Sequence, residues 1–222
     1  MISPNEIIRT NRNSIALTIN EKGDLIVRAP FSMPVEKIYD FIKEKQNWIE
    51  KKQTFIKNTL NENKDITEYN SIFLLGKKYP IVMVKGLDKA ILMKDHLAIP
   101  YTSSINIKKH NLKTFLCLNI EKIILPKINN FARKIGVSPT SVKIINSKAK
   151  WGMCDSKYNI YFNYKLAMLS TEMIEYVIVH ELCNIKHLNH SKEFWKQVEK
   201  FMPDYKSVVN MLKKSDFLIK LF

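Results

Sequence analysis

The sequence predicts an α+β fold in two parts. Residues 1–102 form a β-rich N-terminal subdomain with one long helix, and residues 103–222 form a helical C-terminal subdomain with a small antiparallel sheet. Short alternating runs broken by Gly and Pro dominate the first part, whereas apolar residues at helical spacing dominate the second. Hydrophobic residues make up 45% of the chain, which is enough for a packed core.

The N-terminal part is predicted to begin with a β-hairpin, because residues 14–20 and 25–28 alternate around turn residues at 21–24. A long helix is expected from Val35 to about Leu60, with Pro34 beside its first turn. Short apolar runs then predict a meander of antiparallel strands. These runs are residues 72–75, 79–84, 90–93 and 97–99.

The C-terminal part is predicted to open with a helical region from 103 to about 135. Pro126 should kink or divide this region, and Gly136 should end it. Strands are expected at 142–145 and 159–164, with a hairpin turn between them at 155–157. Three further helices should follow. Ser170 caps the first, Ser191 caps the second, and the third runs from Tyr205 to about Lys214.

The charge and cysteine content bear on location and partners. A formal net charge of +15 has two interpretations, a surface that binds nucleic acid or a merely solvated lysine surface. Scattered lysines and few arginines favour the second. Three cysteines indicate reduced thiols and a cytoplasmic protein. We expect no membrane partner, because no stretch approaches the roughly 20 apolar residues of a membrane span.

The strongest chemical signal is a histidine-rich run. Three of the five histidines lie between residues 180 and 190, and His180-Glu181 with Asn184 has the HExxH spacing of zincins, with Asn in place of the second His. Residues four apart share a helix face, so His180 and position 184 can hold one Zn²⁺ while Glu181 serves as general base. His190 is the third candidate ligand. The chain must turn before it, because ten helical residues would separate it from His180 by roughly 15 Å.

Asn184 leaves the strength of this metal site open. An amide oxygen suits zinc less well than imidazole. His187 or Cys183 could substitute as a ligand, although a solvated histidine and a buried small hydrophobe are the simpler interpretations. The sequence therefore allows a weakened site, a rearranged site, or an inactive protein that keeps the fold.

Trp151 and Gly152 precede the predicted hairpin turn and have two interpretations. They can line a cleft in which a peptide binds by strand addition, with Gly permitting close backbone approach. Alternatively, Trp151 anchors the core beside a bulge.

The chain resembles the YgjP-like (DUF45) family of metal-dependent hydrolases, which are kin to the SprT-like zinc metalloproteases. The matching segments span nearly the whole chain and are residues 9–15, 27–30, 48–49, 75–77, 150–154, 180–183, 189–191, 194–195 and 202–205. The resemblance implies a zincin-like C-terminal subdomain, zinc at positions 180, 184 and 190, and Glu181 as the residue that activates water. The chain departs from the family pattern at Asn184 and at Met153, where the family usually has Ser.

Three functions follow as hypotheses. The first is a zinc-dependent metallohydrolase, metallopeptidase-like, whose activity is weakened or lost through Asn184. The second is a metal-dependent nucleotide hydrolase that cleaves a phosphoanhydride, although no Gly-rich phosphate loop supports it. The third is a catalytically degenerate member that binds nucleic acid or a protein through its lysines. The sequence does not indicate an oligomeric state.

Overall fold

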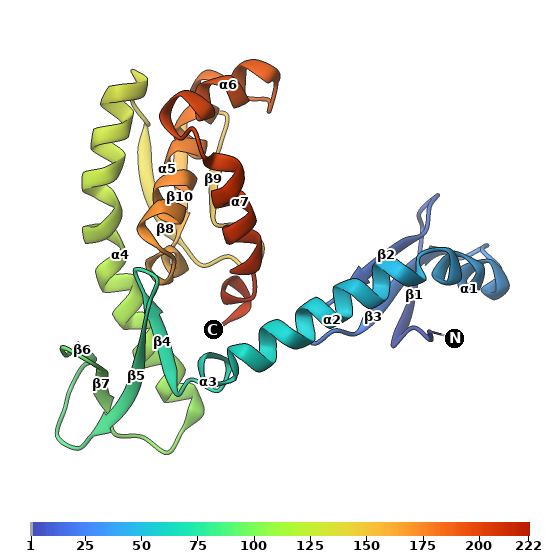
Figure 1. Ribbon diagram of the computed structural model, residues 1–222, viewed down its shortest axis with the longest axis horizontal. Coiled ribbons are helices and arrows are strands. Elements are labelled where there is room, and N and C mark those ends of the chain that lie inside the picture. Colours follow the sequence, from blue (N-terminus) through green and yellow to red (C-terminus); the bar gives the residue numbers. More distant parts are fainter. Residues whose placement is uncertain (1) are drawn as a thin grey trace. The chain divides into compact units, whose positions relative to one another are not determined.

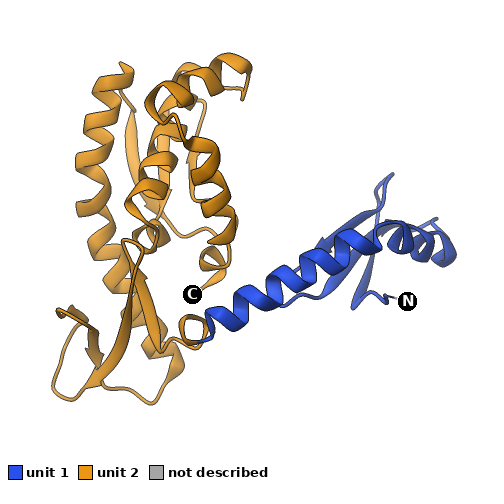
Figure 2. Cartoon of the chain, viewed as in Figure 1, with its two compact units in different colours: residues 1–64 blue, residues 65–222 orange. Residues whose placement is uncertain are grey.

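The computed structural model describes residues 2–222 and confirms the α+β fold class (Figure 1). Two compact units are present, residues 1–64 and residues 65–222 (Figure 2). The predicted boundary falls after residue 102, whereas residues 65–102 lie in the second unit. Apolar side chains of residues 72, 97 and 99 belong to the same hydrophobic core as the long helix that follows them, which explains this grouping.

The first unit is a three-stranded sheet with two helices. Its elements are β1 (Glu6–Thr10), β2 (Ala16–Ile19), β3 (Leu25–Pro30), α1 (Val35–Glu44) and α2 (Gln46–Glu62). The predicted hairpin is confirmed, because β2 and β3 pair antiparallel. Strand β1, which was not predicted, pairs parallel to β3. The predicted long helix is two helices that meet at Lys45, and short helix α3 (Lys64–Thr67) follows them.

The second unit starts with a four-stranded sheet. Its strands are β4 (Ser71–Leu74), β5 (Lys77–Val84), β6 (Ile91–Leu92) and β7 (Leu97–Pro100), in the order β4-β5-β7-β6. The predicted antiparallel meander is wrong in one respect, because β5 and β7 pair parallel. The buried residues of β7 take a central position in the sheet, and the two exposed residues of β6 form its edge.

Helix α4 (Ile105–Ile135) is followed by a second small sheet. The helix continues through Pro126, so the expected division does not occur. Pro126 lies on an exposed face, where the carbonyl group that loses its helical hydrogen bond can be hydrated. Gly136 ends the helix in the left-handed conformation with φ of 74°, as predicted. The sheet has the order β8-β10-β9, and its strands are β8 (Ser141–Ile145), β9 (Gly152–Cys154) and β10 (Asn159–Asn163). The predicted hairpin between 142–145 and 159–164 is wrong, because β8 pairs parallel to β10. The turn at 155–157 instead joins β10 to antiparallel β9, which was not predicted, so this sheet is mixed.

The remaining elements place a buried helix at the centre of the second unit. They are η1 (Tyr164–Met168), α5 (Thr171–Lys186), α6 (Lys192–Phe201), α7 (Tyr205–Lys214) and η2 (Leu218–Lys220). Helix α5 lies between α4 and α7 and also contacts β9 (Figure 1). The predicted caps are confirmed, because Ser170 accepts from the backbone N–H of Met173 and Ser191 from that of Phe194. None of the helices in residues 2–222 is long and apolar enough to cross a membrane.

Candidate active site

The structure brings His180 and His190 together. Helix α5 ends at Lys186, the chain turns through residues 187–191, and α6 begins at Lys192. This turn returns His190 to the helix that carries His180, and the two ring centroids are 5.0 Å apart. The sequence spacing requires a turn between His180 and His190 if the two residues are to bind one metal ion, and this turn is present.

The ring of His180 is held by aromatic neighbours. The hydroxyl of Tyr176 lies 3.4 Å from Nδ1 of His180, and the ring of Phe194 is 5.0 Å away, measured between ring centroids. Burial, together with the nearby His190, lowers the pKa of His180 to about 4. His180 is therefore a neutral imidazole at physiological pH, the form that binds metal ions. Tyr176 was not predicted as a site residue, although its position four residues before His180 places it on the same helix face.

The carboxyl group of Glu181, the residue after His180 on α5, lies inside the protein. Glu181 is 6% exposed, and its Oε2 accepts a hydrogen bond of 3.1 Å from Nδ2 of Asn184. Burial raises the pKa of Glu181 to about 7, against the opposing effects of the Asn184 hydrogen bond and the positive charge of Lys150. A carboxyl group that titrates near neutrality suits proton transfer at physiological pH.

Asn184 lies one helical turn after His180, and its amide faces Glu181. The hydrogen bond to Glu181 uses the amide NH₂ group, and no hydrogen bond among the described residues uses Oδ1. The described residues thus provide two imidazoles and one amide oxygen. This donor set fits Zn²⁺, but less tightly than three imidazoles would.

The two alternative ligands have other surroundings. Nε2 of His187 lies 3.1 Å from Oε1 of Gln197, and Cys183 is fully buried in the core. Within residues 2–222 no group of three His, Cys, Asp or Glu side chains is arranged to hold a metal ion. The structure therefore places neither His187 nor Cys183 in a three-ligand site.

Strand β9 passes directly over Glu181. A Cβ atom at Gly152 would lie 2.7 Å from Oε1 of Glu181 and 3.0 Å from Cγ1 of Val177, so only glycine fits here without a shift. Trp151 is nearly buried, and its Nε1 donates a 3.1 Å hydrogen bond to Oδ1 of Asp216. Trp151 therefore packs in the core, as the second interpretation states. At Gly152 the backbone of β9 approaches Glu181 closely, as the first interpretation states.

Replacing Gly152 with alanine is expected to destabilise the protein by about 1–3 kcal/mol, because the added methyl group overpacks a buried contact. Urea denaturation of Gly152→Ala measures this cost. In a Glu181→Ala background the methyl group meets no carboxyl group, so the cost should fall. If Gly152→Ala lowers the free energy of unfolding equally in both backgrounds, the added methyl group does not contact Glu181.

A buried helix that carries His180 and Glu181, followed across a tight turn by a second histidine, is the arrangement of a metallopeptidase-type hydrolase. The chain belongs to the YgjP-like family, because the model of the YgjP-like metallopeptidase domain matches residues 13–215. The resemblance seen in the sequence motifs is thereby confirmed.

Other comparisons add little detail. One similar solved structure is the crystal structure of the metallopeptidase zymogen of Pyrococcus abyssi abylysin. The TM-score is 0.38 at 22% sequence identity, and the match covers 40% of this chain and 90% of that chain. A search of curated proteins finds no match.

Proposed function

We propose that this protein is a zinc-dependent metallopeptidase with a weakened metal centre. His180 and His190 would bind Zn²⁺ through their imidazoles, and Asn184 through its amide oxygen. The observation that carries the proposal is the convergence of the two imidazole rings, 5.0 Å apart, with the buried Glu181 directly after His180 on the same helix. Bound zinc would polarise the peptide carbonyl and make water a nucleophile at neutral pH.

The protein's own groups have separate roles in this proposal. Glu181 accepts a proton from the attacking water and passes it to the leaving amine, and a pKa near 7 suits both steps. The Asn184 amide holds the carboxylate of Glu181 in place, and the Tyr176 hydroxyl orients the ring of His180.

An extended peptide would bind along β9 in this proposal. Among the described residues, strand β9 pairs with β10 on one side only, so its other edge has no partner strand. Main-chain hydrogen bonds to such an edge align a peptide without regard to its sequence. Gly152 is the point of β9 that lies against Glu181, so a peptide bound along this strand passes close to the general base.

The proposal predicts that the purified chain cleaves unfolded casein when Zn²⁺ is added and that a chelator stops the cleavage. We expect micromolar rather than trace zinc to be needed, because the third ligand is an amide. Cleavage is measured as release of acid-soluble peptides. Pyrophosphate release from nucleoside triphosphates without casein cleavage would favour the nucleotide hydrolase instead. Salt-sensitive nucleic-acid binding with neither activity would favour the non-catalytic function.

A further inference from the structure

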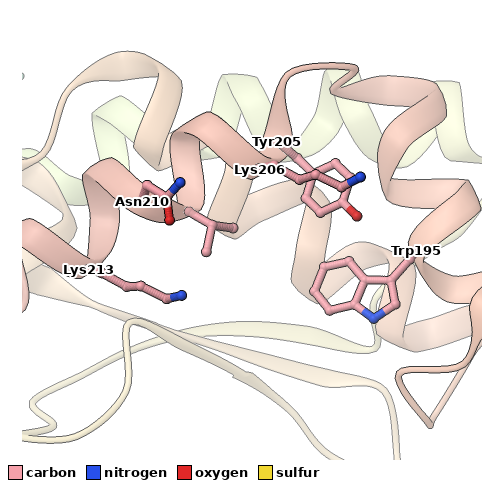
Figure 3. A pocket seen from close by; sticks show the side chains of 6 residues that line it. Trp195, Tyr205, Lys206, Asn210 and Lys213 are labelled. Carbon is pink, nitrogen blue, oxygen red and sulfur yellow. The ribbon is translucent and has the colours of Figure 1, made fainter. Parts of the chain in front are cut away.

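An open cleft of about 300 Å³ lies between residues of α6 and α7 (Figure 3). Trp195 of α6 faces it from one side, and residues of α7 face it from the other. The lining residues are Trp195, Tyr205, Lys206, Val209, Asn210 and Lys213. On α7 the residues at 206, 210 and 213 are four and three apart, so they share one helix face.

Trp195 joins the cleft to the candidate active site. Its ring centroid is 5.9 Å from that of His180 and 5.8 Å from that of His190. The same ring stacks on Tyr205 at 5.3 Å with an interplanar angle of 16°. Trp195 therefore contacts both the candidate metal centre and the cleft, so that one substrate can occupy both sites.

The cleft combines an apolar floor with positive charge at its rim. Trp195, Tyr205 and Val209 are half-buried, whereas Lys206 and Lys213 are exposed. None of the lining residues is acidic. Within the described part of the chain neither lysine forms an ion pair, and Nζ of Lys206 lies over the ring of Tyr205, 5.8 Å from its centroid. Either ammonium group can therefore still pair with an anion. A side chain with a short apolar stem and a negative end complements these surfaces.

We propose that this cleft is a subsite for an acidic side chain of a peptide substrate, with Lys206 and Lys213 as the specificity-determining residues. The proposal deepens the proposed peptidase function and rests on it. The path from the histidine rings to Tyr205 comprises two ring-to-ring steps, of 5.9 Å and 5.3 Å. An extended peptide advances about 3.3 Å per residue, so the acidic residue would lie roughly two to four positions from the scissile bond.

The experiment compares labelled peptides that differ only by Glu or Gln at one position, scanned across positions two to four residues from the cleaved bond. Binding to the full-length chain is followed by fluorescence anisotropy at low salt, and cleavage of the same peptides is followed with added Zn²⁺. We expect roughly tenfold tighter binding of the best Glu peptide over its Gln partner, which corresponds to about 1.4 kcal/mol, because exposed ion pairs contribute little individually. Raising the salt should reduce this ratio.

The double variant Lys206→Gln/Lys213→Gln should abolish the preference for Glu without changing the binding of the Gln peptide. Lys214→Gln is the matched control, because Lys214 is an exposed lysine of the same helix that does not line the cleft. A preference that survives the double variant, or that Lys214→Gln reduces equally, overturns the proposal. So does equal binding of the Glu and Gln peptides by the unmodified chain.

The two readouts separate this proposal from the proposed function. Binding that prefers Glu, is lost in the double variant and occurs without cleavage would support an acidic subsite and contradict the peptidase function. Cleavage without any preference for Glu would support the peptidase function and overturn the subsite. If the double variant loses affinity for a nucleoside triphosphate while the peptides bind alike, the cleft binds phosphate groups and the acidic-peptide subsite is also overturned.

Discussion

Replacing Asn184 with histidine is expected to raise the affinity for Zn²⁺ by roughly two to three orders of magnitude. Structural zinc sites bind with an apparent free energy of about 10–16 kcal/mol over four ligands, or about 2.5–4 kcal/mol for each ligand. Each 1.4 kcal/mol corresponds to a factor of ten in the dissociation constant. An imidazole at position 184 would complete the set that His180 and His190 begin, on a helix already positioned by its buried face.

Competition with a chromophoric chelator at fixed pH measures the zinc affinity of both proteins. Asn129→His is a suitable control, because it adds a histidine to an exposed position of α4 outside the candidate site. Equal gains from Asn184→His and Asn129→His would indicate adventitious surface binding. No gain from Asn184→His would mean that His180 and His190 are not zinc ligands, whatever the fold.

The helices and the turn that carry the candidate site were largely predictable, because their signals are local. The spacing of His180, Glu181 and Asn184 places them on one helical turn, and the helix length to His190 requires a turn between them. The capping residues Ser170 and Ser191 mark the helix starts with side-chain hydrogen bonds that follow from the sequence. Such features depend on neighbours within a few residues, and the structure reproduces them.

Features that depend on distant partners were not predicted. Strand β5 pairs parallel to β7, and β8 pairs parallel to β10. The alternation of apolar and polar residues within one strand does not specify its partner or the direction of pairing. The break between α1 and α2 at Lys45 has no side-chain cap, Gly or Pro to mark it. The cleft beside Trp195 was missed for a similar reason, because its basic rim lies on α7 while its aromatic wall comes from α6.

Glu181→Gln is expected to lower peptide hydrolysis by about 10²–10⁴-fold, the usual contribution of a general acid or base. Glutamine has nearly the shape of glutamate, and its amide oxygen can still accept the hydrogen bond from Asn184. Folding and zinc affinity should therefore be unchanged, so the loss would report the missing proton acceptor alone. The substitution is best measured both in the native chain and together with Asn184→His, where more of the protein carries zinc.

The matched control is Glu175→Gln, which removes a carboxylate from the same helix. Glu175 pairs with Lys127 at 2.6 Å, outside the histidine cluster. We expect this variant to lose some stability and to keep its hydrolytic rate, because a partly exposed ion pair contributes little and does not touch the substrate. Comparable rates for Glu181→Gln and Glu175→Gln would contradict the role of Glu181. Full activity of Glu181→Gln in the Asn184→His background would contradict it most directly, because zinc would then be held tightly and only the carboxylate would be missing.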